Sequence, residues 1–182
     1  ILLHEGANVI NVKKAGNVYV DYFADDPDTA PAVTIHFVTG KVNGYFDATV
    51  QSNEDWNRLL DNAVSPVMDV KGKYIQLAYP VEQLKKLAYG KGKELAENYD
   101  KIMQVQYDFS ARVNFNYFMF RDGDGVAFEG TDGTMKAAIG PEVTTNWGIH
   151  HEIGHVMQMR PWLTWGGMTE VSNNLFSMYG TM

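Results

Sequence analysis

Apolar residues near the end of the chain recur at the spacing of a helix. The recurrence runs from Ile149 to Met157 and gives this segment one hydrophobic face. Thr144 and the two residues after it offer side chains that can cap a helix. Pro161 ends the helix, because the residue before a proline avoids the α region. The pattern therefore predicts a helix from about Asn146 to Met159.

The beginning of the chain has the pattern of a β-rich region. Val, Val and Tyr alternate with other residues at 18–23, and Val, Ile and Phe do so again at 33–37. A turn at 15–17 precedes the first of these runs, and a polar loop at 25–28 precedes the second. We therefore expect residues 1–50 to form a β-rich N-terminal part.

Helix and strand signals alternate in the centre of the chain. They predict, in order, a short helix capped by Ser52, a strand from Tyr74 to Tyr79, a helix from Val81 to Ala88 opened by Pro80, and a helix from about Lys93 to Phe109. Together with the β-rich beginning, these elements indicate the α+β class. Residues 51–182 then form a second region, which contains the candidate chemistry.

Two further strand candidates, Val113 to Phe120 and Met135 to Ile139, are separated by turns rich in Asp and Gly. The turn at 122–125 suggests a calcium loop, but Val126 stands where a third oxygen ligand is needed, so a hairpin turn is favoured. The strand from Met135 leads toward the predicted helix at 146–159. It is either an internal strand or an edge strand that pairs with an extended peptide.

Composition excludes some functions. The formal net charge of −7 argues against nucleic acid as a partner and against binding to an anionic membrane surface. The chain contains no cysteine, so disulfides and thiolate metal ligands are ruled out. No apolar run is long enough to span a membrane.

The predicted helix at 146–159 contains a metal-binding pattern, since residues 151–155 read His-Glu-Ile-Gly-His, or HExxH. Histidines four apart lie on one face of a helix, about 5–6 Å apart at Cβ, and can bind one zinc ion. Glu152 lies about 100° further round and can take a proton from a water activated by zinc. The alternative is a histidine pair with a purely structural role in a core helix.

A catalytic zinc site built on this helix needs a third protein ligand. A metzincin is excluded, because Gln158 and Pro161 occupy the positions where that class has Gly and His. Glu170 is the only acidic residue after Glu152 and lies at the start of a second predicted helix, capped by Thr169. It is either the third ligand or an ordinary partner of the helix dipole. The apolar face of the second helix is expected to comprise Val171, Leu175, Met178 and Tyr179.

The segments Trp147–Gln158 and Trp165–Asn174 resemble the M60-like (enhancin and mucinase) metallopeptidases, a gluzincin family. The likeness is strong from about Trp147 to Tyr179 and looser around 36–47. It implies a zincin-like catalytic region over 51–182, with Zn²⁺ held by His151, His155 and Glu170 and with Glu152 as the general base. Because that family continues beyond the stretch present here, we expect the chain to be part of a larger protein, incomplete at its C-terminal side.

The resemblance also implies a function. It implies a secreted or cell-surface endopeptidase that hydrolyses peptide bonds of O-glycosylated, mucin-like proteins. Two alternatives stay open: a glycoprotein-binding module with a degenerate or structural zinc site, and a metal-dependent hydrolase that acts on a non-peptide bond.

Several nearby residues are weaker candidates for a role in the site. Asn174 is expected to orient the Glu170 carboxylate, and Gln158 to orient His155 or the substrate. His150 is expected either to face solvent, which is favoured, or to support the metal-binding side chains from behind. Trp162 and Trp165 either line the cleft or anchor their loop. Tyr179 is the remaining candidate for stabilising the oxyanion, although a packing role is favoured.

Overall fold

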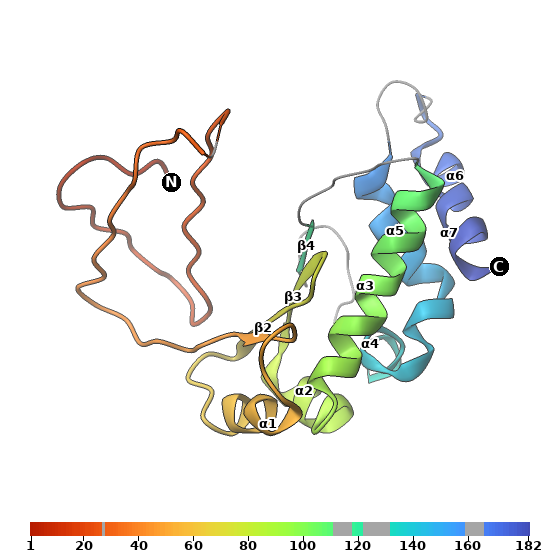
Figure 1. The fold of residues 1–182 in the computed structure, drawn as a ribbon, viewed down its shortest axis with the longest axis horizontal. Coiled ribbons are helices and arrows are strands. Elements are labelled where there is room, and N and C mark those ends of the chain that lie inside the picture. The colour runs from red at the N-terminus through yellow and green to blue at the C-terminus, as the bar shows by residue number, and fades with distance from the viewer. Residues whose placement is uncertain (27, 111–117, 122–131, 159–165) are drawn as a thin grey trace.

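The computed structural model describes residues 1–26, 28–110, 118–121, 132–158 and 166–182. A four-stranded sheet forms its centre, in the order β1 (Phe46–Asp47), β2 (Val67–Lys71), β3 (Ile75–Pro80) and β4 (Phe118–Arg121). β2 and β3 are antiparallel, whereas β1 pairs with β2, and β4 with β3, in parallel. The helices α3, α5 and α7 lie on one side of this sheet (Figure 1).

The helices are α1 (Asn53–Asp61), α2 (Val81–Ala88), α3 (Gly92–Phe109), α4 (Asp132–Ile139), the 3₁₀ helix η1 (Pro141–Thr145), α5 (Trp147–Met157), α6 (Thr169–Ser172) and α7 (Asn174–Thr181). The predictions of α1, α2, α3 and α5 are confirmed. The cap on α1 is also as predicted, because Ser52 and Asp55 form a reciprocal capping box. The short strand β2 was not predicted.

The turn at 71–73 joins β2 to β3 and is fixed by α3. The carboxylate of Asp100 accepts hydrogen bonds from the backbone N–H groups of Lys73 and Tyr74, each at 2.8 Å. Gly72 lies against the same carboxylate, since a β-carbon there would come within 2.7 Å of it. Asp100 therefore fixes the position of the β2–β3 hairpin relative to α3.

Buried tyrosines connect the sheet to the helical side. Tyr79 on β3 and Tyr99 on α3 share a hydrogen bond of 2.6 Å, and Tyr99 donates another, of 2.9 Å, to the backbone carbonyl of Ala138 on α4. All three residues are buried. A hydroxyl buried in the core needs a hydrogen-bond partner, so this chain of bonds fixes α4 on α3.

The predicted β-rich beginning is wrong as a statement of secondary structure. Among the described residues, none before Phe46 lies in a helix or a strand. The segment lies on the side of the sheet away from α3 (Figure 1), where Tyr19 and Asn17 bond the carboxylate of Asp69 on β2. Alternation predicts a strand only where a neighbouring strand supplies hydrogen bonds, and the described residues supply none here.

The predicted strand from Met135 to Ile139 is also wrong, because these residues form the end of α4. Ala and Lys in this run are good helix formers, and five residues are too few to separate the two periods. This segment therefore is not an edge strand that could pair with an extended peptide. β4 lies at the edge of the sheet instead and matches the end of the strand predicted from Val113; residues 113–117 lie outside the described residues.

The second predicted helix is present but buries another face. It is divided into α6 and α7 at Asn173. The expected apolar face is largely exposed, whereas Ser172, Asn173, Phe176 and Ser177 are buried. The buried face is the one that packs on α5, where Asn173 and Phe176 lie against Gly154.

Candidate metal centre

His151 and His155 lie one turn apart on α5, as the sequence predicts. Their rings stand almost perpendicular, with centroids 4.7 Å apart and planes at 88°. The side chain of Asn146 caps the helix by accepting a hydrogen bond of 3.1 Å from the N–H of Ile149. Both histidines are partly buried, with side-chain exposures of 17% and 23%.

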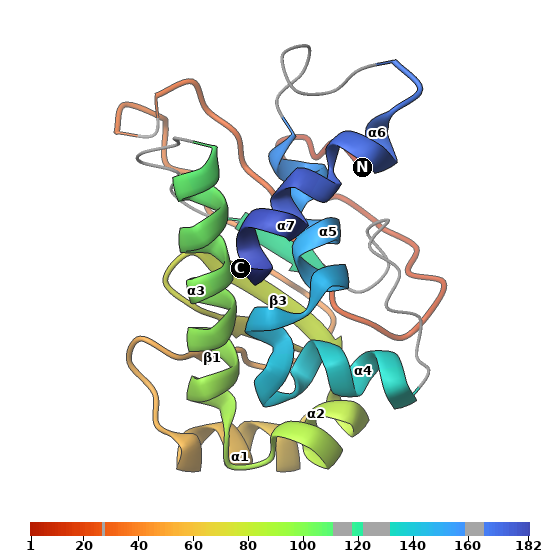
Figure 2. The ribbon, with the colours of Figure 1, turned by 90° about the vertical axis from the view of Figure 1, so that its right-hand side faces the viewer.

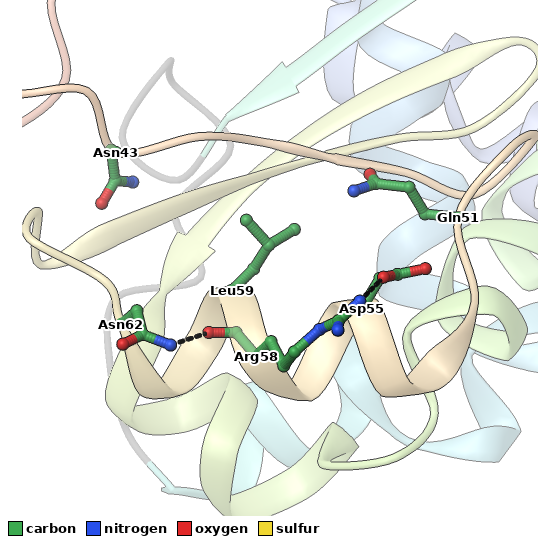
Figure 3. Close-up of a pocket in the computed structure, with 6 residues that line it drawn as sticks. All are labelled: Asn43, Gln51, Asp55, Arg58, Leu59 and Asn62. Atoms are coloured by element: carbon green, nitrogen blue, oxygen red, sulfur yellow. Dashed lines mark hydrogen bonds and ion pairs between the residues drawn. The ribbon is translucent and has the colours of Figure 1, made fainter.

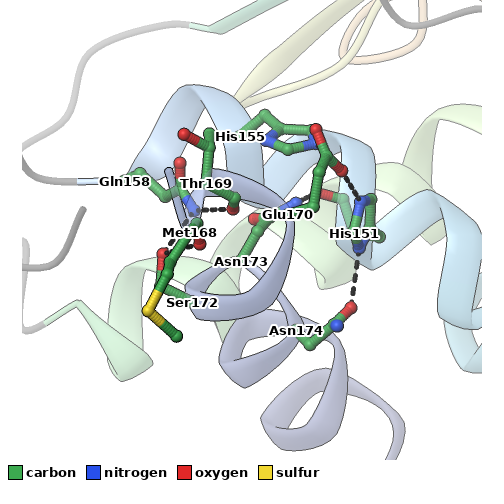
Figure 4. A network of polar contacts seen from close by, with 9 residues as sticks. All are labelled: His151, His155, Gln158, Met168, Thr169, Glu170, Ser172, Asn173 and Asn174. Carbon is green, nitrogen blue, oxygen red and sulfur yellow. Dashed lines mark hydrogen bonds and ion pairs between the residues drawn. The ribbon is translucent and has the colours of Figure 1, made fainter. Parts of the chain in front are cut away.

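The carboxylate of Glu170 extends from the first turn of α6 to both imidazoles (Figure 4). Its Oε2 atom lies 3.1 Å from Nε2 of His151 and 3.2 Å from Nε2 of His155. The side chain of Glu170 itself is 75% exposed. One atom from each of the three side chains can be chosen so that all lie within 4.8 Å of one another.

These side chains fit a zinc ion in both chemistry and spacing. Zinc prefers nitrogen and carboxylate oxygen ligands at about 2.0–2.2 Å, which places tetrahedral ligands about 3.3–3.6 Å apart. The distances of 3.1 and 3.2 Å from Glu170 to the two histidines approach that spacing. Three protein ligands leave a fourth position for a reactant, as a catalytic site requires. Within the described residues, no other cluster of three or more such side chains can hold a metal.

The environment of Glu170 favours its charged form. The hydrogen bond with His151 and the nearby charge of His155 lower the pKa of the Glu170 carboxyl below its ordinary value. A carboxylate must be ionised to bind a metal. Its position between the two imidazoles therefore suits Glu170 to that role.

Glu152 directly follows His151 on α5 and is partly buried. It lies about 100° round the helix from that histidine. This position leaves it beside the His–His–Glu group without making it a fourth member.

Asn173 and Asn174 both contact His151. The side-chain oxygen of Asn174 lies 2.9 Å from Nδ1 of His151, and the side-chain NH₂ of Asn173 donates to the backbone carbonyl of the same residue. Asn174 was predicted to orient Glu170, and the structure places it on the histidine instead. Its place one turn after Glu170 brings it beside α5, not beside the carboxylate.

Gln158 holds the segment that bears Glu170. Its side-chain NH₂ donates to the backbone carbonyl of Thr169 at 2.8 Å and to the hydroxyl of Ser172 at 3.3 Å (Figure 4). The prediction that it orients His155 or the substrate does not match these contacts. Gln158 links the end of α5 to α6 and so helps to hold the helix that carries Glu170.

His150 was predicted to face solvent and is fully buried instead. Its Nδ1 lies 2.8 Å from the side-chain nitrogen of Gln106 on α3, and its Nε2 lies 2.8 Å from the carbonyl of Thr144. Burial lowers the pKa of the imidazole. Sequence reasoning missed Gln106, although it lies three and four residues after Met103 and Ile102, on the buried face of α3.

Two glycines allow α5 and α7 to approach closely. A β-carbon at Gly154 would come within 2.3 Å of the side-chain oxygen of Asn173, and one at Gly180 within 2.1 Å of the His150 ring. The helices lie directly against each other (Figure 2). The glycine inside the HExxH segment therefore determines how near α6 and Glu170 can come.

Other candidate residues lie apart from this group. The hydroxyl of Tyr179 donates to Asp108 on α3, and this bond raises the pKa of the phenol. Trp162, Trp165 and the turn at 122–125 lie outside the described residues.

A shallow pocket at α1 is lined by Asn43, Gln51, Asp55, Arg58, Leu59 and Asn62 (Figure 3). Arg58 pairs with Asp55 there, and no member of the His–His–Glu group lines it.

Comparison with known proteins identifies the family. The model of peptidase M60, enhancin and enhancin-like proteins, matches residues 41–181, which is well over half of the chain. The chain therefore belongs to the peptidase M60 family, as its sequence resemblance predicts. A search of curated proteins finds no match.

Solved structures with the same fold agree with this assignment. A metallopeptidase from Bacteroides thetaiotaomicron matches with a TM-score of 0.61 and 22% identity, over 80% of this chain and 27% of that one. A metallopeptidase in complex with Tn antigen matches with a TM-score of 0.61 and 20% identity, over 80% and 30%. A conserved protein of unknown function from Bacillus anthracis str. Ames matches with a TM-score of 0.59 and 21% identity, over 74% and 32%. The chain thus spans about a third or less of each of these structures.

Proposed function

We propose that this chain contains the centre of a zinc metallopeptidase that hydrolyses peptide bonds in O-glycosylated, mucin-like proteins. The observation that carries the proposal is the convergence of His151, His155 and Glu170, with ligand atoms within 4.8 Å of one another. Membership of the M60 family supports peptide hydrolysis. The similar metallopeptidase in complex with Tn antigen supports a glycoprotein as the substrate.

In this proposal His151, His155 and Glu170 hold the metal, and Glu152 moves the proton. Zinc, when bound, supplies Lewis acidity to the scissile carbonyl and to the attacking water. The Glu152 carboxylate accepts a proton from that water as its oxygen attacks the carbonyl carbon. It then delivers the proton to the amine nitrogen as the C–N bond breaks, so Glu152 returns to its starting state.

We infer that the proposed activity lies outside the cell or at its surface, and membership of the family and a glycoprotein substrate support this inference. None of the described helices is both long and apolar enough to cross a membrane. The competing function is a glycoprotein-binding module in which the same three side chains hold a structural ion or none.

Two variants test the proposal. Glu152→Gln is expected to keep zinc, measured by metal analysis, and to lose cleavage of a mucin-like glycoprotein. His151→Ala is expected to lose both, and Glu142→Gln, at an exposed site on η1, serves as the control. Wild-type cleavage should stop with EDTA and return with added zinc. Equal zinc loss in the Glu152 and His151 variants would contradict the roles, and glycoprotein binding without chelator-sensitive cleavage would favour the binding module.

A further inference from the structure

We infer that Asn174 is a positioning residue, which selects the tautomer of His151 and aims its Nε2 lone pair at the metal. The inference rests on the proposed metal centre and assigns a role to a side chain that touches neither metal nor substrate. The observation behind it is that the two ring nitrogens of His151 face different partners, 2.9 Å from Asn174 and 3.1 Å from Glu170.

A neutral imidazole carries one proton, and the nitrogen that keeps it cannot bind a metal. Nε2 of His151 faces Glu170, on the side where Nε2 of His155 also lies. Nε2 is therefore the nitrogen that must be free of its proton. The side-chain oxygen of Asn174 accepts a hydrogen bond only if Nδ1 keeps the proton. Asn174 thus stabilises the tautomer that binds a metal and opposes the one that does not.

The surrounding contacts fix Asn174 at this distance. It is the first residue of α7, and its neighbour Asn173 is fully buried and bonds the backbone carbonyl of His151. Asn173 in turn lies against Gly154 of α5. The His151 backbone and ring are both held from one short segment, so the ring has little freedom to turn. Ordered partners of this kind raise the basicity of a metal-binding histidine as well as orienting it.

The chemistry of the acceptor separates this role from simple packing. Asn174→Leu keeps the approximate shape of the side chain and removes the acceptor. Asn174→Asp keeps an oxygen in place and strengthens the acceptor through its charge. A positioning role predicts opposite effects of these two changes, whereas a packing role predicts similar ones.

The test measures zinc affinity of the 182-residue chain by competition with a chromophoric chelator, together with the visible absorption of the Co²⁺ form. Asn174→Leu is expected to weaken zinc binding about 10–100-fold, the usual effect of losing such a partner. Asn174→Asp should bind zinc at least as tightly as wild type and reproduce its Co²⁺ spectrum. Leu175→Ala, next in the chain and exposed, should leave zinc affinity unchanged.

Nitrogen NMR of His151 in the metal-free chain gives a second measurement that does not depend on metal. In the metal-free chain the Glu170 carboxylate competes for a proton on Nε2, so the measurement compares the proton share on Nδ1 between variants. That share should be larger in wild type and Asn174→Asp than in Asn174→Leu. Zinc affinity of Asn174→Leu within twofold of wild type, equal loss in the Leu and Asp variants, or an unchanged tautomer would each overturn the inference. A wild-type chain that binds no zinc would instead overturn the proposed metal centre.

Discussion

Gly154 and Asn173 pack so tightly that a β-carbon on the glycine would come within 2.3 Å of the asparagine side-chain oxygen. Asn173 also bonds the backbone of His151, and Glu170 lies three residues before it. The distance between α5 and α7 therefore determines how the carboxylate meets the two histidines. One hydrogen atom in place of a methyl group makes this approach possible.

Gly154→Ala is accordingly expected to separate the two helices. Overpacking of this kind costs about 1–3 kcal/mol, which outweighs the gain in helix propensity from Gly to Ala. The free energy of unfolding, measured in urea, should fall by the difference between the two, up to about 2 kcal/mol, and zinc affinity should fall with it. A β-carbon at Gly148, on the same helix, would lie 3.3 Å from the side-chain oxygen of Asn146, so Gly148→Ala needs only a small shift and should cost much less stability. Similar results for both variants would show that close packing at Gly154 has no special role.

Gln158→Met should weaken the link between α5 and α6. The change removes the hydrogen bonds to Thr169 and Ser172 while keeping the volume of the side chain. Each lost bond costs about 0.5–1.5 kcal/mol, and the first turn of α6 becomes free to move the carboxylate of Glu170. We expect lower thermal stability and weaker zinc binding by chelator competition. Val156→Met, at an exposed site on α5, is the control, and equal zinc affinity in all three proteins would contradict the link.

Asp47→Asn should reduce stability in a pH-dependent way. Burial alone would raise the pKa of the Asp47 carboxyl, but the Lys71 ammonium at 2.8 Å and hydrogen bonds from Thr49 outweigh it and lower the pKa. A lowered native pKa adds stability above the unfolded value of about 3.9, and this is lost as the pH falls through the native value.

The measurement for Asp47 is urea unfolding from pH 7 down to pH 3. The Asn variant should be less stable by about 1–3 kcal/mol at pH 7, and the difference should shrink toward pH 3. Asp25→Asn, at an exposed position, should follow the wild type throughout. A constant difference across this range would mean that ionisation of Asp47 adds nothing.

Much of the candidate site was predictable because its geometry is local. Helical spacing alone brings His151 and His155 to one face, and Glu170 was the only acidic residue left to join them. Ser52 and Pro80 similarly marked the starts of α1 and α2. In each case neighbours in the sequence determine the structure, so the pattern contains the information.

The wrong predictions concern contacts between distant segments. His150 is buried because Gln106, 44 residues earlier, provides a hydrogen-bond partner. The face that α7 buries includes Phe176 and is the one that lies against Gly154 of α5, which is distant in the sequence. The alternation at 18–23 lacks a neighbouring strand among the described residues. Local sequence patterns do not reveal which distant residue a side chain will contact in the fold.

The unequal exposure of the three candidate ligands has a consequence for how an ion enters and leaves. The Glu170 side chain is 75% exposed, whereas those of His151 and His155 are 17% and 23% exposed. A hydrated cation arriving from solvent meets the carboxylate first and sheds water before the imidazoles can bind it. In the proposed metal centre we therefore expect removal of the Glu170 carboxylate to change the rate of metal exchange more than its exposed position alone would suggest.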